Sequence, residues 1–116
     1  MSNVSLMQQL QGFLQITNQR QQLIASNMAN VDTPGYHTQD IDFQKAIQSA
    51  LSQTGDAPVQ ANPIEVQGLN ERPDGNNVNI DRESMMLSET QLQYQMGVQL
   101  IKAEFHKLLT AIKEGS

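Results

Sequence analysis

The chain has 116 residues, of which 38% are hydrophobic, 16% are charged and 4% are aromatic, and its formal net charge is -5. One modest domain is the most that this length holds, and because Leu, Ile, Val and Phe make up only about a quarter of the residues, we expect a thin core that relies on regular helix packing and on neighbouring chains. The absence of cysteine excludes disulfides, zinc-thiolate sites and cysteine nucleophiles, and the evenly spread negative charge argues against nucleic acid as a partner.

The amino-terminal region lacks the features of a cleavable secretory signal. Its first basic residue is Arg20, so a charged segment before an apolar run is missing. No apolar run approaches the roughly 20 residues that a membrane-spanning helix needs. We therefore expect no transmembrane segment, and any export must use a route that does not depend on a cleaved signal peptide.

A long amphipathic helix is predicted to begin near Ser5. Apolar side chains recur at alternating intervals of three and four residues, which is typical of the seam of a coiled coil. The row comprises Met7, Leu10, Leu14, Thr17, Gln21, Ile24, Met28 and Val31, and six of its eight members are apolar.

A tight turn and a short helix are predicted next. Residues 33–36 place Pro34 and Gly35 at the two central positions, which is the chemistry of a type II turn, because proline presets a negative φ and glycine accepts a positive one. Either Asp40 or Asp42 is suited to cap a short helix. Its apolar face is formed by Phe43, Ile47, Ala50 and Leu51.

Residues 52–79 are predicted to form an exposed loop with weak β character. This stretch is rich in proline, glycine and asparagine, which favour turns over regular elements. A brief apolar alternation suggests one strand or one arm of a hairpin. The alternating residues are Val59, Ala61, Ile64 and Val66.

A second long helix is predicted over residues 81–113, with Asn79 or Asp81 as its cap. Acidic residues lie in its first turn and lysines near its end, as the helix dipole favours. Its apolar row has the same spacing as the first and is more regular, with seven of eight members apolar. The row comprises Leu87, Gln91, Tyr94, Val98, Ile101, Phe105, Leu108 and Ile112.

These elements predict a mainly α fold in which two long terminal helices form a coiled-coil-like pair, joined by a turn, a short helix and an irregular loop. We treat residues 1–116 as a single helical domain with the 52–79 loop exposed. One apolar row cannot offset the conformational entropy lost on ordering such a helix, and further apolar residues widen the surface beyond a two-helix seam. We therefore expect packing between subunits through the apolar rows, with Met7, Leu10, Leu14, Ile24, Leu87, Tyr94, Val98, Ile101, Phe105, Leu108 and Ile112 as the packing residues.

Catalytic and metal-binding patterns are missing from the sequence. The two histidines, His37 and His106, have no local nucleophile or orienting acid in a known signature. Residues 74–81 resemble a calcium loop, but Arg82 and Ser88 occupy the positions where the loop needs glycine and glutamate. We expect no enzymatic activity, no cofactor and no metal.

The segment SNMANVDTPGY, residues 26–36, closely resembles the signature of flagellar axial proteins, the family that forms the rod and hook of the bacterial flagellum. The motif residues are Asn27, Asn30, Thr33, Pro34, Gly35 and Tyr36. The following IDF segment and the later run GNNVNIDRE, residues 75–83, are similar to proximal rod members rather than to the hook or the distal rod. The resemblance covers about residues 6–51 and 72–113.

The resemblance implies a building block of the proximal rod of the basal body, whose terminal helices pack with those of neighbouring subunits into a helical tube. It also implies export through the flagellar type III apparatus without signal cleavage, and a location in the periplasmic space. A Phe-x-x-x-apolar export element is implied at Phe43 to Ile47. The implied partners are further copies of the chain, the rod-base adaptor FliE, the membrane ring protein FliF and the rod protein FlgC.

The motif also has a physical interpretation. After Met28 the chain must leave a packed helix sharply, and Asn27 and Asn30 are placed to satisfy its last backbone groups while Pro34 and Gly35 set the exit direction. One alternative stays open at this stage. The chain would then be a soluble helical adaptor or export chaperone that binds a partner helix in its groove.

Overall fold

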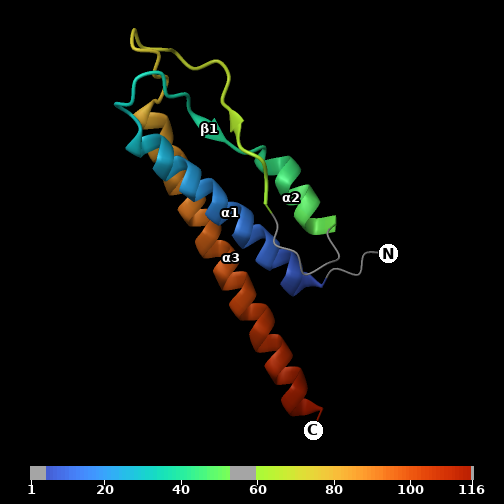
Figure 1. Ribbon diagram of the computed structural model, residues 1–116. Helices are drawn as coiled ribbons and strands as arrows, with labels where there is room; N and C mark the ends of the chain where they lie inside the picture. Colours follow the sequence, from blue (N-terminus) through green and yellow to red (C-terminus); the bar gives the residue numbers. More distant parts are fainter. Residues whose placement is uncertain (1–4, 53–59, 116) are drawn as a thin grey trace.

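The computed structural model describes residues 5–52 and 60–115, which form an elongated, mainly helical molecule (Figure 1). The elements in chain order are α1 (Leu6–Ala29), β1 (Gln39–Asp40), α2 (Phe43–Ser52), β2 (Ile64–Glu65) and α3 (Ile80–Glu114). The molecule measures 68 × 26 × 18 Å along its principal axes. The predicted fold class is confirmed, with two long terminal helices joined by a turn, a short helix and an irregular segment.

Helix α1 begins where the sequence predicts, because Ser5 and Gln8 form a capping box. The Gln8 amide donates to Ser5 Oγ (3.1 Å), and the Ser5 amide donates to Gln8 Oε1 (3.2 Å). This arrangement satisfies two amide groups that a helix start otherwise leaves unpaired. At the other end, the Asn30 side chain donates to the Ser26 carbonyl (2.8 Å), so one of the last helical carbonyls is also paired.

Helix α3 is the longest element, with 35 residues. Asn79, not Asp81, is its cap, because Asn79 Oδ1 accepts from the Arg82 amide (3.1 Å). Asp81 lies in the first turn and Lys113 in the last, where each complements the helix dipole. The helix is therefore about 52 Å long at 1.5 Å per residue, and it runs along most of the molecule.

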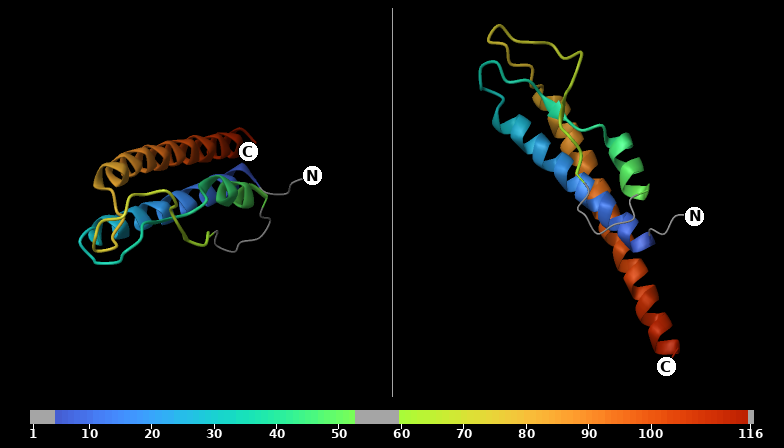
Figure 2. Two further views of the ribbon diagram at one scale, coloured as in Figure 1. Left: turned by 90° about the horizontal axis from the view of Figure 1, so that it is seen from above. Right: turned by 45° about the vertical axis from the view of Figure 1, so that its right-hand side comes forward.

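Helices α1 and α3 lie antiparallel and side by side (Figure 2). The residues of α3 that are most deeply buried are Glu83, Thr90 and Gly97, which recur at every seventh position. A Cβ atom at Gly97 would lie 2.7 Å from Leu14 Cδ2 and 3.1 Å from a carbon of the Phe13 ring, so the missing side chain at Gly97 makes room for these two side chains of α1.

The centre of this helix contact is consequently narrow and made of small side chains. Thr17 of α1 and Thr90 of α3 are fully buried, and each hydroxyl donates to a carbonyl one turn earlier in its own helix (2.7 Å in both cases). With their hydroxyls satisfied in this way, the threonines pack across the interface as small side chains. The larger apolar residues of α3 are displaced to the flanks.

Helix α2 packs against α1 and completes a thin core. Ile16, Ile41 and Ala46 form its buried cluster. Phe13 and Phe43 meet edge to face, with ring centroids 6.2 Å apart, and the Arg20 guanidinium lies 5.0 Å from the centre of the Phe43 ring. The helix is capped by Asp42, whose Oδ1 accepts from the Lys45 amide (3.1 Å), rather than by Asp40.

The segment before α3 has little regular structure. Strands β1 and β2 form a two-residue antiparallel ladder, in which Gln39 pairs with Glu65 and Asp40 pairs with Ile64. The predicted weak β character is thus confirmed at Ile64, while Val59 lies outside the described residues. Gln19 also holds this segment on α1, because its side-chain amide pairs with both the amide and the carbonyl of Ala61 (2.9 and 2.5 Å).

Candidate assembly surfaces and the polar junction at the helix turn

The predicted turn after α1 is present at residues 33–36. The Tyr36 amide donates to the Thr33 carbonyl (3.2 Å), and Gly35 has a φ of 75°. A positive φ at the third position is what a type II turn requires, and Pro34 presets the second. The chain therefore leaves α1 by a sharp turn in which Asn30 pairs with a last helical carbonyl, whereas Asn27, which was also expected to pair with such groups, bonds to Gln39, Tyr36 and Glu83 instead.

A second turn, residues 72–76, packs directly on the first. The Gly35 amide donates to the Asp74 carbonyl (2.9 Å), and the Arg72 guanidinium donates to the Val31 carbonyl. Gly75 has a φ of 89°, and a Cβ atom there would lie 3.2 Å from the Cα of Gly35. Two glycines with positive φ thus lie in direct contact. The two turns together form one end of the molecule.

Asn27 is the centre of the hydrogen bonds beneath these turns, and it is 1% exposed. Its Nδ2 donates to the Gln39 carbonyl (2.8 Å) and to Glu83 Oε1 (2.6 Å). Its Oδ1 accepts from the Gln39 amide (3.0 Å) and from the Tyr36 hydroxyl (2.9 Å). One amide side chain therefore ties α1, the turn, β1 and α3 together.

Glu83 supplies a fully buried carboxylate on the α3 side of this arrangement. Its Oε2 accepts from Arg82 Nη1 (2.5 Å), and Arg82 Nη2 lies 3.9 Å from Asp40 Oδ2. Asp40 in turn receives two hydrogen bonds from Arg20 (3.1 Å each). Two cations and two anions alternate across three elements, so each buried charge has a partner of opposite sign.

Asn76 is the centre of the hydrogen bonds in the second turn, as Asn27 is at the end of α1. Its Nδ2 donates to the Asn30 carbonyl (2.9 Å) and the Thr33 carbonyl (2.8 Å), and its Oδ1 accepts from the Val78 amide (2.8 Å). We call the set of Asn27, Tyr36, Asn76, Arg82 and Glu83 the polar junction. It fixes the motif turn to the start of α3.

Sequence reasoning found only part of the polar junction. The motif identified Asn27 and Tyr36, but Asn76 was expected in an exposed loop, and the acidic residues in the first turn of α3, Glu83 among them, were attributed to the helix dipole. The density of amide residues in 76–79 was the one available signal, because such side chains are favoured where irregular backbone needs hydrogen-bond partners.

His37 joins the exposed loop to the turn by an ionic contact. Its Nε2 lies 2.8 Å from Glu71 Oε1, and its Nδ1 lies 3.6 Å from Glu65 Oε2. The hydrogen bond to Glu71, assisted by Glu65, raises the pKa of His37 above its ordinary value of 6.5, although partial desolvation opposes the change. The protonated imidazolium is thus the form that bridges the two carboxylates.

Of the packing residues predicted on α1, Leu14 lies beside Gly97 of α3, and Leu10 lines a pocket with residues of α2. Ile24 is buried, and Met7, Leu10 and Leu14 are half-buried.

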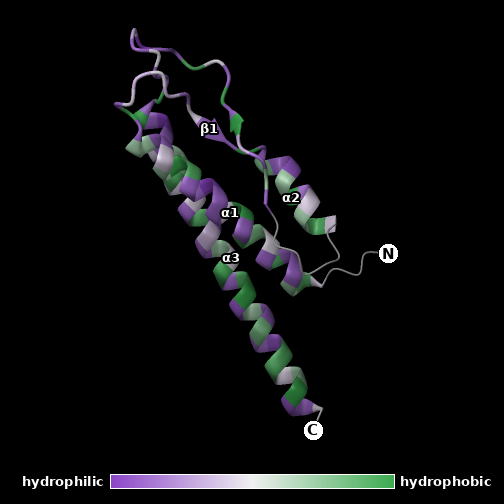
Figure 3. Cartoon of the chain, viewed as in Figure 1, coloured by the Kyte–Doolittle hydropathy of each residue, from purple (hydrophilic) through white to green (hydrophobic). Residues whose placement is uncertain are grey.

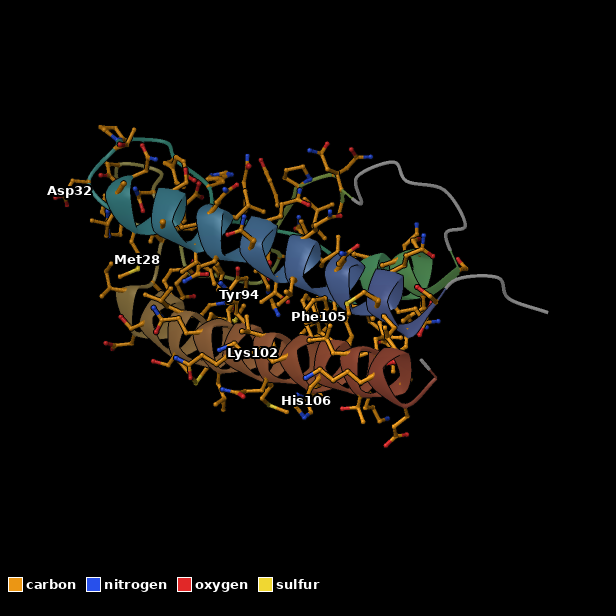
Figure 4. All side chains as sticks on the ribbon, turned by 90° about the horizontal axis from the view of Figure 1, so that it is seen from below. Met28, Asp32, Tyr94, Lys102, Phe105 and His106 are labelled. Atoms are coloured by element: carbon orange, nitrogen blue, oxygen red, sulfur yellow. The ribbon has the colours of Figure 1, made fainter. Side chains whose placement is uncertain are left out.

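The packing residues predicted on α3 lie beside the narrow centre of the α1 contact rather than within it. Leu87, Val98 and Ile101 are half-buried, while Tyr94, Phe105, Leu108 and Ile112 are exposed, Ile112 at 69%. Figure 4 shows Tyr94 and Phe105 on the side of α3 near α1, and His106 on the opposite side. We call this row of seven residues the apolar flank.

A second row of large apolar side chains lies on the other side of α3. It comprises Met85, Leu92, Met96 and Leu100, each more than half exposed. Apolar residues therefore continue along α3 well outside its contact with α1, as the colouring of Figure 3 shows. Contiguous exposed apolar residues of this kind are typical of surfaces that bind another molecule.

An apolar groove lies where α1 begins, between α1 and α2, with one α3 residue at its edge. Its volume is about 170 Å³. We call it the end groove, and its lining residues are Leu6, Gln9, Leu10, Phe13, Ile47, Ala50, Leu51 and Leu100.

The residues of the implied export element, Phe43 and Ile47, lie in the first half of α2. Both are half-buried and pack against the core cluster. In the folded chain they are therefore engaged in contacts with α1.

Within residues 5–52 and 60–115, no three histidine, aspartate or glutamate side chains are grouped closely enough to hold a metal ion. In the same described residues, none of the helices has the length and apolar character required to span a bilayer.

Comparison with known proteins identifies relatives over nearly the whole chain. Residues 7–37 match the model of a family described as flagella basal body rod protein. The chain is 31% identical to the flagellar basal body rod protein FlgB of Escherichia coli (strain K12), with 89% of each chain covered. It is 29% identical to the protein of the same name from Salmonella typhimurium over the same share, and 26% identical to that of Bacillus subtilis (strain 168) over 93% of each chain.

Proposed function

This chain belongs to the family of the flagellar basal body rod protein FlgB, and on that premise we propose that it is a structural subunit of the proximal rod. It is a component of the basal body rod and not an enzyme. In the proposed role, the chain polymerises through its terminal helices into the drive shaft that transmits torque. The proposed role is mechanical, and the transmission of torque depends on how rigidly neighbouring copies pack.

The observation that carries the proposal is the position of the apolar residues on α3. Small side chains at Thr90 and Gly97 make the contact with α1, which leaves four residues of the apolar flank exposed, namely Tyr94, Phe105, Leu108 and Ile112. A helix whose apolar residues remain exposed after the chain has folded still has surface to remove from water. Packing against neighbouring subunits buries that surface.

The partners and location follow from the same premise. We propose that the chain contacts further copies of itself and other flagellar proteins, with the rod-base adaptor FliE, the ring protein FliF and the rod protein FlgC as the neighbours. We also propose export through the type III apparatus without signal cleavage, to a rod in the periplasmic space. Phe43 and Ile47 would have to leave their contacts with α1 to be read as an export element.

Deletion and complementation test the proposed function. A strain that lacks this chain should be non-motile and should yield no rods when basal bodies are purified. Expression of the wild-type chain should restore both, and the chain should be found in the purified rods. Normal rods and normal swimming without the chain would contradict the proposal.

The adaptor alternative predicts a different behaviour of the purified chain. An adaptor or export chaperone should form a stable complex with a partner helix and be missing from purified rods. Quantifying the chain in purified basal bodies separates the two roles, because a rod subunit must remain in the finished structure.

A further inference from the structure

The chain has six methionines and neither cysteine nor tryptophan. Without a thiol to react first, the thioether sulfur of methionine is the main target of an oxidant. Met85 and Met96 of α3 are 64% and 56% exposed. Among the other methionines of the described residues, Met7, Met28 and Met86 are half-buried. The fold therefore divides the methionines into two classes that differ in their exposure to solvent.

Met85 and Met86 show this difference at adjacent positions of one helix. The Met86 sulfur accepts a weak hydrogen bond from Arg20 Nη2 of α1, at 4.0 Å, so its side chain is turned toward the helix contact. Figure 4 shows Met28 on the side of α1 near α3. Met85 instead lies on the exposed side of α3. Exposure controls the rate at which a thioether is oxidised, so these neighbours should react differently.

Met85 and Met96 belong to the exposed row of α3 that also contains Leu92 and Leu100, which we call the outer row. The two methionines are 96 - 85 = 11 positions apart, which is close to three full turns and about 16 Å of helix, so they lie on the same side. Two of the four apolar side chains of the outer row are thus open to oxidation.

Hydrogen peroxide oxidises a thioether by transferring one oxygen atom. A lone pair of the sulfur attacks a peroxide oxygen, the O–O bond breaks, an S–O bond forms and water leaves. The sulfur loses two electrons and the peroxide gains two. The product, methionine sulfoxide, places a polar acceptor on a side chain that was apolar. Burial of this acceptor without a donor is costly, and the side chains of Leu92 and Leu100 offer no donor.

Oxidation of the outer row should leave the fold intact. Helix α3 contacts α1 through Glu83, Thr90 and Gly97, which are its most deeply buried residues. Met85 and Met96 are more than half exposed, so the added oxygen atoms remain in solvent in the isolated subunit. The modification therefore changes the surface of a folded chain.

We propose that Met85 and Met96 form an oxidation-sensitive site, which hydrogen peroxide converts to the sulfoxide before Met7, Met28 and Met86, and that a subunit modified in this way is not incorporated into rods. The second part rests on the proposed function, in which neighbouring subunits bury exposed apolar surface of α3. The modification is reversible by methionine sulfoxide reductases. Both stereochemical classes of the reductase are needed, because oxidation at the sulfur gives two epimers.

Peroxide treatment of the purified full chain, followed by mass spectrometry of its peptides, tests the chemistry. We expect Met85 and Met96 to be oxidised about fivefold faster than Met86 and Met28, because exposure governs access to the sulfur. In concentrated urea the rates should become equal, since the difference comes from the fold. Equal rates in the folded chain would overturn the first part of the proposal.

Two double variants test the consequence in cells. M85Q with M96Q puts an uncharged polar group in place of the sulfoxide, whereas M85L with M96L keeps apolar side chains that peroxide does not oxidise. Both replacements retain helix propensity at exposed positions, so circular dichroism should show unchanged helix content. We expect few rods and poor swimming from the glutamine variant. The leucine variant is the matched control and should form normal rods.

Assembled rods give an independent test. In purified basal bodies Met85 and Met96 should be oxidised more slowly than in the free chain, because neighbouring subunits cover them. Failure of this inference can be told apart from failure of the proposed function. If the wild-type chain is required for rods, but the glutamine variant restores them fully or both methionines react as fast in rods as in the free chain, only the inference is wrong.

Discussion

At the scale of single residues, the polar junction determines how the motif turn is held. Asn27 and Glu83 are both buried, and a buried polar group is costly unless all its hydrogen-bond partners are present. The Nδ2 and Oδ1 atoms of Asn27 each make two hydrogen bonds, so a residue of similar size with a different set of donors and acceptors cannot replace it. The junction is therefore specific as well as stabilising.

Replacement of Asn27 by alanine should destabilise the chain by about 2–4 kcal/mol, because it removes four hydrogen bonds and leaves the buried Glu83 carboxylate without one donor. Urea unfolding monitored by circular dichroism measures the change. Asn18→Ala, at an exposed position of the same helix, should change stability by less than about 0.5 kcal/mol. Equal losses in the two variants would contradict the role given to Asn27.

The ionic contact of His37 should depend on pH. Its pKa is raised in the folded chain, mainly by the hydrogen bond to Glu71, so its stabilising contribution is fully present below pH 6.5 and is lost as the pH rises through the raised value. An NMR titration of the His37 ring should therefore give a pKa above 6.5, and Glu71→Gln should lower it. Glu89→Gln, on α3, should leave it unchanged.

At the scale of elements, the contact of α1 with α3 depends on small residues rather than on the apolar row. The 3-4 spacing of apolar residues predicted the helices and their limits within a residue or two. It did not predict which side of α3 meets α1. That side carries Glu83, Thr90 and Gly97, which recur every seven residues but are not large apolar residues, so the spacing of apolar residues does not reveal them. The rotation of α3 about its own axis is set by the close approach of the two helix backbones. This approach depends on three-dimensional packing.

Gly97→Ala should separate these helices locally. The new Cβ atom would lie 2.7 Å from Leu14 Cδ2, so we expect a net loss of about 1–2 kcal/mol even though alanine favours a helix by about 1 kcal/mol. Thermal unfolding measures this loss. Gln95→Ala, at an exposed position of α3, should be neutral or stabilising, and a stabilised Gly97→Ala would contradict the close contact.

The turn element gives a prediction about assembly. Gly35→Val places a β-branched residue at a φ of 75°, which such residues rarely adopt, so the turn should change direction while α1 and α3 remain paired. We expect a soluble monomer with near-normal helix content but few rods and poor swimming. Normal motility of this variant would show that the exit direction has no role in assembly.

At the scale of the whole molecule, the chain has a thin core and a large apolar exterior. The polar junction stabilises the end that contains the motif turn, and α2 covers the first half of α1, whereas the end of α3 lacks comparable support. The sequence predicted the thin core and the apolar surface for neighbouring subunits, since apolar residues are few and arranged in two long rows. It could not predict the whole polar junction, because the hydrogen bond of Asn27 to Glu83 and those of Asn76 to the carbonyls of Asn30 and Thr33 depend on how distant segments meet.

Hydrogen exchange on the isolated chain should follow this division. Amides of residues 100–114 should exchange much faster than those near Ile24 and Glu83, because local stability falls where few buried contacts exist. On assembly into rods the same amides should become protected. Uniform, strong protection along α3 in a dilute monomer would contradict the expectation that neighbouring copies stabilise this helix.

The antiparallel arrangement of α1 and α3 has a practical consequence for labelling. Helix α1 begins and α3 ends toward the same end of the molecule, with the end groove at the start of α1, while the loop around residues 67–70 lies toward the other end (Figure 1). A fluorescent protein or affinity tag fused at either terminus would therefore crowd the same surface. A short epitope inserted at exposed Gln67 or Asn70 is the better choice for following this protein in living cells.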